Sequence, residues 1–284
     1  MNLTQYISEL SANARAARAI TEGVTAPQYA VRASDAPVVA LLSPHPDDEC
    51  IVGGLALRLG VQSAWRVVNL AITVGSDPTR QTARALELRA ACDYLGFECE
   101  RFGERGLIGI SHAAHLANDE AWRTNVSALA KKLDQLRPAL LLAPHPHDGH
   151  AAHVGTYWLM LDALALLPKS YAPHVALTEY WSTMELPNLL VQLSPTEVAQ
   201  LVSGLLCHAG EIARNPYHAS LPLWMMENVR RGSERVGAPG SAAAAFDFAT
   251  IYTLLRWREG KLKAEFTGGK LLASSDSAEA LIER

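Results

Sequence analysis

The sequence has 284 residues, enough for one large α/β domain or two small ones. Hydrophobic residues make up 49% and charged residues 19%, as in a globular protein, and the formal net charge of −4 argues against a basic surface for nucleic acid. No run reaches the ~18 apolar residues of a membrane span, and the N-terminal segment lacks the apolar core of a signal peptide. We therefore expect a cytoplasmic protein with neither a nucleic acid nor a membrane as its partner.

Apolar runs of strand length alternate with segments of helical periodicity along most of the chain. In chain order we predict helix 1–20, strand 36–43, helix 50–62, strand 65–75, helix 79–96, strand 97–102, helix 121–136, strand 139–144, helix 155–167, strand 174–181, two helices after 182, and a hairpin or edge strands at 246–266 with a turn at Glu259-Gly260. The strands are continuously apolar, which is typical of strands buried on both faces of a parallel sheet. This order predicts an α/β fold, a Rossmann-like three-layer sandwich with a mostly parallel central sheet.

The domain organisation follows from the same pattern. No internal repeat or interdomain linker is visible in the sequence. We expect residues 1–284 to form a single domain with its core at about 36–180. A C-terminal helical and β-hairpin elaboration would then occupy about 182–270.

Two polar motifs follow predicted strands at their C-terminal ends. The first contains His45, Asp47 and Asp48 and follows strand 36–43, while a histidine-rich run at 144–153 follows strand 139–144. Ligands in open parallel sheets bind outside the carboxyl ends of the strands. We therefore expect both motifs to face the same crevice.

The two motifs together supply the ligand types of a catalytic zinc site, which uses three protein ligands and leaves one position for water. A histidine and an aspartate of the first motif with one histidine of the second make such a set. His150 and His153 lie three apart on one face of a starting helix, so one can bind the metal while the other stays free. An N-cap role for Asp47, a chance His-x-x-His pair and a metal-scavenging histidine surface are the alternatives. The position of both motifs after apolar strands favours the metal site.

The motifs resemble those of the PIG-L/LmbE-like family of zinc-dependent N-deacetylases, which act on N-acetylglucosaminyl lipids, mycothiol- and bacillithiol-type glucosaminides, chitin oligosaccharides and glycopeptide sugars. His-Pro-Asp-Asp-Glu at 45–49 matches the family's first signature without change. His150-Ala-Ala-His153 matches the second, commonly His-Pro-Asp-His, with an altered middle. The stretch 73–98, with its Arg-x-x-Glu-Leu, is also similar, so the resemblance covers about residues 36–180.

The resemblance implies a role for each residue of the two motifs. The zinc ligands would be His45, Asp48 and His153. Asp47 would be the general base, and protonated His150 would stabilise the oxyanion. Histidine and carboxylate ligands also accept Fe2+, Co2+ or Mn2+, so the native metal stays open.

The resemblance also implies substrate-binding residues. Arg84 matches an arginine that contacts substrate hydroxyls in relatives. Relatives often carry an acidic residue after the third strand that contacts the sugar, and Glu104 is the candidate at that place. We include Asp148, within the second motif, among the substrate-binding candidates.

The segment after about residue 182 matches no pattern of the family. Paired arginines there, with Tyr217, His218 and Trp224, can line a substrate entrance and recognise a carboxylate or phosphate. Asn228 and Arg230 are the first candidates. The alternative is a solvated helix face with weak pairs such as Glu227 and Arg231. We expect Trp181 to lie in the core rather than in the cleft.

Three functions are compatible with these observations. The first is a zinc-dependent hydrolase that removes an N-acetyl (acyl) group from an amino sugar or related amide, with an N-acetylated sugar conjugate as the small-molecule partner. The second is a zinc-dependent hydratase of an unsaturated dicarboxylic acid, because some relatives on this scaffold add water to a carbon–carbon double bond. The third is a non-catalytic metal-binding protein, against which an intact Asp47 argues. The sequence leaves the oligomeric state open, a homo-oligomer included.

Overall fold

The computed structural model describes residues 1–237, 240, 242 and 244–282. Within these residues a nine-stranded sheet has the order β3-β2-β1-β4-β5-β7-β6-β9, with β8 paired to β7. The strands are β1 (Val38–Ser43), β2 (Arg66–Ala71), β3 (Glu98–Arg101), β4 (Leu140–Pro144), β5 (His174–Thr178), β6 (Leu189–Leu193), β7 (Phe248–Arg258), β8 (Lys261–Ala264) and β9 (Lys270–Leu272). The α-helices are α1 (Leu3–Ala16), α2 (Asp48–Ile51), α3 (Gly54–Ser63), α4 (Gln81–Leu95), α5 (His112–Ala117), α6 (Glu120–Leu136), α7 (Ala151–Ala165), α8 (Pro195–Leu206), α9 (Ala209–Ile212) and α10 (Tyr217–Gly232).

The sheet is mostly parallel, as the continuous apolar runs predict. Strands β3, β2, β1, β4 and β5 pair in parallel, and β7 is antiparallel to both β5 and β6. All residues of β1, β4 and β5 are buried, because helices cover both faces of these strands.

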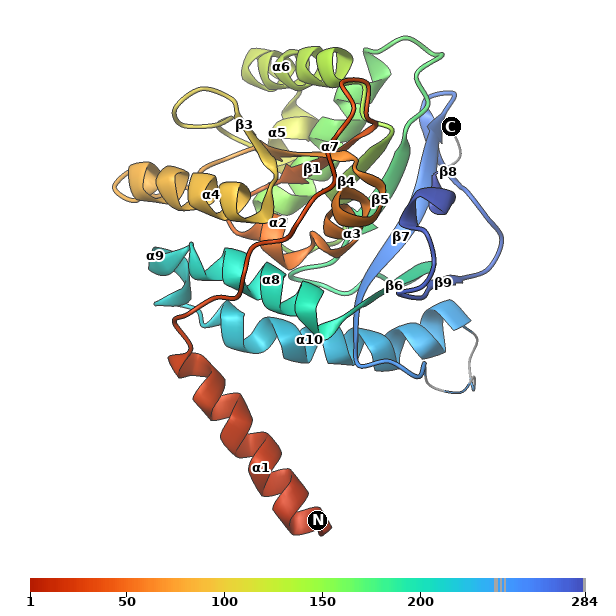
Figure 1. Ribbon diagram of the computed structural model, residues 1–284. Helices are drawn as coiled ribbons and strands as arrows, with labels where there is room; N and C mark the ends of the chain where they lie inside the picture. Colours follow the sequence, from red (N-terminus) through yellow and green to blue (C-terminus); the bar gives the residue numbers. More distant parts are fainter. Residues whose placement is uncertain (238–239, 241, 243, 283–284) are drawn as a thin grey trace.

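Helices form the two outer layers of a three-layer sandwich (Figure 1). On one face Leu55 of α3, Leu88 of α4 and Leu201 of α8 pack into one apolar cluster against the sheet. On the other face Trp122 of α6 and Leu159 of α7 pack into a second cluster. The predicted fold class is therefore confirmed.

Most predicted elements occur within a few residues of their expected bounds, and the hairpin forms as β7 and β8. Its turn residues Glu259 and Gly260 have φ values of 54° and 74°, as a two-residue hairpin turn requires. The helix expected at 50–62 is interrupted, because the chain turns sharply at Gly53. A Cβ there would lie 2.1 Å from the Glu49 carbonyl oxygen. Strands β6 and β9 and helix α5 were not predicted, since each is short and has no clear period of its own.

Helix α1 extends away from the rest of the molecule, and none of its residues is buried (Figure 1). Among the described residues, no helix combines the length and the apolar character needed to cross a membrane.

Arg58 of α3 joins β6 and the segment after β9 to α3 through hydrogen bonds. Its side chain is fully buried. The guanidinium donates hydrogen bonds to several backbone carbonyls, including those of Gln192 at 3.1 Å, Ala273 at 2.9 Å and Asp276 at 2.8 Å. One side chain thus satisfies acceptors on β6 and on the segment that follows β9.

We expect Arg58→Met to lower the free energy of unfolding by about 3 kcal/mol, because hydrogen bonds to a charged group are lost and buried carbonyls are left without a donor. Urea denaturation followed by circular dichroism measures the change. Arg89→Met is the matched control, since Arg89 forms an exposed pair with Asp93 and its loss should cost less than about 1 kcal/mol. Equal stability of the Arg58→Met variant and the wild-type protein would contradict this account.

Candidate functional site

The two sequence motifs meet at one edge of the sheet. Strands β1 and β4 are parallel neighbours, with Leu41 paired to Leu142, so the turns that follow them lie side by side. The turn after β1 carries His45 and leads into α2, and the turn after β4 leads into α7. His150 is the N-cap of α7 and His153 lies in its first turn.

Three atoms of the expected ligand residues face one another. His45 Nδ1 lies 3.2 Å from His153 Nε2, and Asp48 Oδ2 lies 3.8 Å from the first and 3.6 Å from the second. Ligand bonds of about 2.0–2.1 Å separate the corners of a tetrahedral zinc site by about 3.3 Å. The other carboxylate oxygen of Asp48, Oδ1, is buried and has no hydrogen-bond partner among the described residues. The three residues therefore fit a metal ion.

Asp148 lies behind His153 rather than in the cleft. It is fully buried, and its Oδ1 is 3.1 Å from His153 Nδ1, the ring atom that faces away from the other ligand atoms. The backbone N–H of Tyr180 donates to Asp148 Oδ2 at 3.2 Å. Burial lowers the pKa of His153, but the negative charges of Asp48 and Asp148 outweigh it and raise that pKa. This is the arrangement of a carboxylate that orients a metal-ligating histidine.

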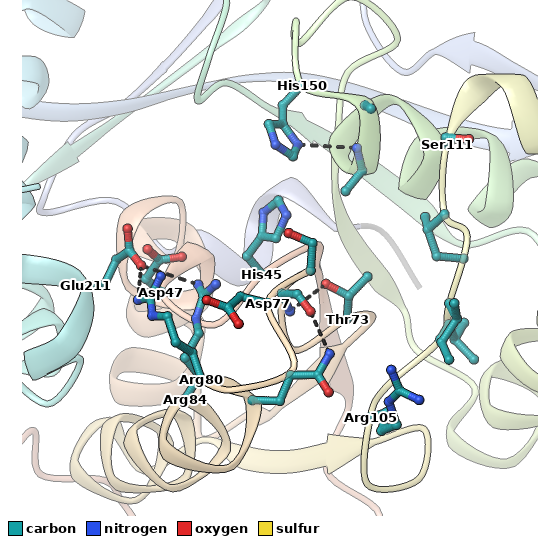
Figure 2. Close-up of a pocket in the computed structure, with 18 of the residues that line it drawn as sticks. His45, Asp47, Thr73, Asp77, Arg80, Arg84, Arg105, Ser111, His150 and Glu211 are labelled. Carbon is teal, nitrogen blue, oxygen red and sulfur yellow. Dashed lines mark hydrogen bonds and ion pairs between the residues drawn. The ribbon is translucent and has the colours of Figure 1, made fainter. Parts of the chain in front are cut away.

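His150 lies next to His45 in the cleft (Figure 2). Its ring is edge-on to the ring of His45, with 4.8 Å between centroids. Its Nδ1 accepts a hydrogen bond of 3.3 Å from the backbone N–H of Ala152. Burial and the neighbouring His153 lower the pKa of His150. One ring atom each of His45, His150 and His153 lies within 4.8 Å of the others, so His150 can add a nitrogen to the metal or face the substrate.

Asp47 lines the cleft in an unusual backbone conformation. Its φ of 114° and ψ of −27° lie in the left-handed half of conformational space, which costs about 1–3 kcal/mol for a residue with a side chain. The side chain is 5% exposed. Burial and the adjacent Asp48 carboxylate raise the pKa of Asp47 well above its usual value, which makes it a stronger proton acceptor.

Glu49, Cys50 and His208 form a second cluster of ligand-type side chains directly behind Asp47. His208 Nε2 is 2.6 Å from Glu49 Oε1, a direct hydrogen bond and shorter than the separation of two ligands on one ion. Burial raises the pKa of Glu49, but His208 and nearby N–H groups outweigh it and lower that pKa. The cluster is a hydrogen-bonded network, and Cys50 is a buried residue of α2.

The motifs open into a cleft of about 980 Å³ (Figure 2). Arg84 lines it and donates a hydrogen bond of 2.9 Å to the Pro46 carbonyl oxygen, next to Asp47. Three guanidinium groups face the single carboxylate of Glu211, with Arg80 at 3.0 Å, Arg214 at 3.3 Å and Arg84 at 3.9 Å. The carboxylates of Asp47 and Asp77 line the same part of the cleft and offset much of this positive charge.

Besides Asp148, three predicted substrate-binding residues lie outside this cleft. Glu104 lines a separate hollow beside α4. Asn228 lines a second cavity of about 260 Å³ and donates a hydrogen bond to the Ala249 carbonyl oxygen. Arg230 is exposed and pairs with two glutamates of its own helix segment. Its neighbour Arg231 points inward instead, lines the second cavity and pairs with Glu179.

Trp181 does not lie in the core, where the sequence analysis expects it. The side chain is 52% exposed and lines the cleft, rather than the core. It follows β5 at the same edge of the sheet as both motifs, and its ring stacks on His150 with 5.7 Å between centroids. Tyr180 lies beside it and stacks on His153.

Sequence reasoning missed several residues of the cleft. Arg80 precedes Arg84 by four residues on α4, and this helical spacing was a usable signal for a second arginine on the same face. Glu211 was also missed and lines the cleft, together with Arg214 and with Tyr217, which the sequence offered as part of a substrate entrance. They come from the C-terminal elaboration, where only the packing of α8 and α9 brings them to the site.

Comparisons with known proteins agree with this geometry. The family described as GlcNAc-PI de-N-acetylase, or PIG-L, matches residues 40–164. Residues 40–164 are a PIG-L domain. The match contains both motifs and ends within α7, so the elaboration that completes the cleft lies beyond it. No curated protein matches the sequence.

Solved structures share the fold of this protein. The conserved protein TT1542 from Thermus thermophilus has a TM-score of 0.56 and 17% identity, with 75% of this chain and 92% of that chain covered. GalB, the 4-carboxy-2-hydroxymuconate hydratase from Pseudomonas putida, has a TM-score of 0.56 and 16% identity, covering 76% and 95%. The N,N'-diacetylchitobiose deacetylase from Pyrococcus horikoshii has a TM-score of 0.55 and 18% identity, covering 78% and 84%.

We expect His153→Ala to remove the metal from purified protein on dialysis. Losing an outer partner of a ligand already costs about 10–100-fold in metal affinity, so losing the ligand should cost at least as much. Metal content by plasma mass spectrometry measures this. His147→Ala is the control, because His147 belongs to the same histidine-rich run but is exposed. Full metal occupancy in His153→Ala would contradict the proposed ligand set.

Proposed function

We propose that this protein is a metal-dependent hydrolase that removes an acetyl or other acyl group from the nitrogen of an amino sugar or related amide. The observation that carries the proposal is the cluster of His45, Asp48 and His153 with the carboxylate of Asp47 beside it in the cleft. The PIG-L domain and the fold shared with a deacetylase support the same reaction class.

His45, Asp48 and His153 would hold the ion, with zinc as the first choice and Fe2+, Co2+ or Mn2+ as alternatives. When bound, the ion supplies a Lewis acid that polarises the amide carbonyl and makes water easier to ionise near neutral pH. Asp148, beside His153 Nδ1, would keep the ring of His153 turned so that its Nε2 faces the ion.

Asp47 is proposed as the general base. Its side chain reaches the cleft from the turn next to the ligand residues, and its raised pKa suits a group that takes a proton from water. The same carboxyl group can then return that proton to the departing amine.

His150 is proposed to stabilise the oxyanion. Because its Nδ1 accepts the N–H of Ala152, a neutral ring carries its proton on Nε2, which is free to donate. The lowered pKa of His150 favours this neutral form over the protonated form expected from the family resemblance. A neutral N–H donor can serve an oxyanion hole.

The cleft walls fit a sugar conjugate. Trp181 and Tyr180 supply aromatic faces beside the two histidines of the second motif. Arg84 and Asn215 supply polar groups to the same cleft. An amino sugar presents both apolar ring faces and hydroxyl groups, so it can use both kinds of wall.

A hydratase of an unsaturated dicarboxylic acid is the second candidate. The three guanidinium groups around Glu211 favour an acidic substrate. The fold shared with a 4-carboxy-2-hydroxymuconate hydratase also supports this reading. The proposed base and metal ligands are compatible with adding water to a double bond as well as to an amide.

An acetate-release screen across N-acetylated sugar conjugates, with protein loaded with each of the four metals, tests the proposal. We expect one class of conjugate to release acetate, and Asp47→Ala to lower kcat about 10²–10⁴-fold with its metal retained. Asp93→Ala, which alters an exposed carboxylate of α4, is the control.

Three outcomes would contradict the assignment. Loss of the metal in Asp47→Ala would make that residue a ligand. Unchanged kcat in that variant would remove it from the reaction. Turnover of an unsaturated dicarboxylic acid without release of acetate from any conjugate would favour the hydratase.

A further inference from the structure

We propose that His208 and Glu49 are positioning residues that hold Asp47 in its reactive conformation. A continuous buried path runs from the His208 ring through the Glu49 carboxylate to the backbone N–H of Asp47. The inference concerns how Asp47 is held and rests on the proposed function only for its kinetic consequence.

Asp47 needs support because its backbone is strained. Its φ of 114° is uncommon for a residue with a side chain, and such a conformation persists only when its surroundings over-determine it. The side chain at this position reaches the cleft, whereas Asp48, one residue later, faces the ligand histidines. The strained turn is therefore what separates the directions of two adjacent carboxylates.

Glu49 supplies the support. Its Oε2 accepts the Asp47 N–H at 3.0 Å, while its Oε1 accepts His208 Nε2 at 2.6 Å and the Cys50 thiol at 3.4 Å. Glu49 is completely buried and His208 is 1% exposed. A buried carboxylate is stable only when it is paired and hydrogen-bonded, so removing His208 leaves Glu49 without its main partner.

His208 reaches Glu49 because α8 lies unusually close to α2. A Cβ on Gly204 of α8 would stand 2.9 Å from the Cys50 sulfur, so only glycine permits this approach. The backbone N–H of His208 donates to the Leu205 carbonyl oxygen at 2.9 Å, and the chain turns here at the end of α8.

The same short segment holds the turn from a second side. Glu211 follows His208 by one helical turn and pairs with Arg80 and Arg84, and Arg84 donates to the Pro46 carbonyl oxygen. The peptide bond between Pro46 and Asp47 is thus held at its oxygen through Arg84 and at its N–H through Glu49. Residues 208–211 lie beyond the matched PIG-L domain. The C-terminal elaboration therefore supports the turn that carries Asp47.

Four variants of the full-length, metal-loaded protein test the proposal. His208→Ala should lower kcat about 10–100-fold with KM and metal content unchanged, the usual cost of losing an outer partner of a reacting group. Glu49→Gln should do the same, because the amide carries no negative charge and replaces one of the two carboxylate oxygens that accept from the Asp47 N–H and from His208. His208→Gln keeps an N–H donor and should restore most of the lost kcat. The double variant Glu49→Gln/His208→Ala should be no slower than Glu49→Gln alone, since His208 acts through Glu49.

Hydrogen exchange of the Asp47 amide provides a readout that does not depend on activity. We expect faster exchange at this amide in His208→Ala and Glu49→Gln, and wild-type exchange in His208→Gln. His174→Ala is the matched control. His174 is also buried beside a glutamate, 3.4 Å from Glu265, but lies at the opposite end of β5 from the cleft. Its kcat and Asp47 exchange should not change.

Three results would overturn the inference. Wild-type exchange at the Asp47 amide in His208→Ala would show that His208 does not hold the turn. Loss of metal in that variant would show that it acts on the metal site instead. Equal losses in His174→Ala would show a general effect of destabilisation. If no amide or acid is turned over by the wild-type protein, the proposed function fails, and the exchange rates still decide this inference.

Discussion

The parallel pairing of β1 with β4 is the constraint on which the site depends. Val39, Ala40 and Leu41 pair with Leu140, Leu141 and Leu142, so both strands end at the same level of the sheet. His45 and His153 are 108 residues apart in the chain. The pairing brings His45 Nδ1 to 3.2 Å from His153 Nε2. The pairing is stable because both faces of these strands are buried beneath helices.

A site at the end of a sheet also needs its loops held in place, and here the C-terminal elaboration does this. Helix α8 packs against α2 through Gly204 and brings His208 to the turn, and α9 brings Glu211 to the arginines of α4. The turn that carries the proposed base is thus contacted by a segment outside the matched PIG-L domain.

The fold and the two motifs could be predicted because their signals are local. Continuous apolar runs identify buried parallel strands, and a polar motif directly after a strand has to lie at the sheet edge. The orientation of Arg230 and Arg231 could not be predicted in this way. They are adjacent on α10, and a rotation of about 100° per residue sends one to solvent and the other to Glu179. Only the packing of α10 on the sheet decides which is which.

Long-range contacts explain the other differences. Glu104 lies in a loop whose path no periodicity describes, and it lines a neighbouring hollow instead of the cleft. Trp181 was expected in the core at the end of the predicted strand 174–181, but the strand ends three residues earlier at Thr178. His208 carries no signal in the sequence, since its partner Glu49 is far away in the chain and only the approach of α8 joins them.

The central claim is that His45, Asp48 and His153 together hold one metal ion beside Asp47. A crystal structure of zinc-loaded protein, with anomalous scattering recorded at the zinc edge, tests it most directly. The account predicts one dominant peak at about 2.0–2.2 Å from His45 Nδ1, His153 Nε2 and a carboxylate oxygen of Asp48. A dominant peak between Glu49, Cys50 and His208, or no peak among the three proposed ligands at full zinc loading, would contradict it.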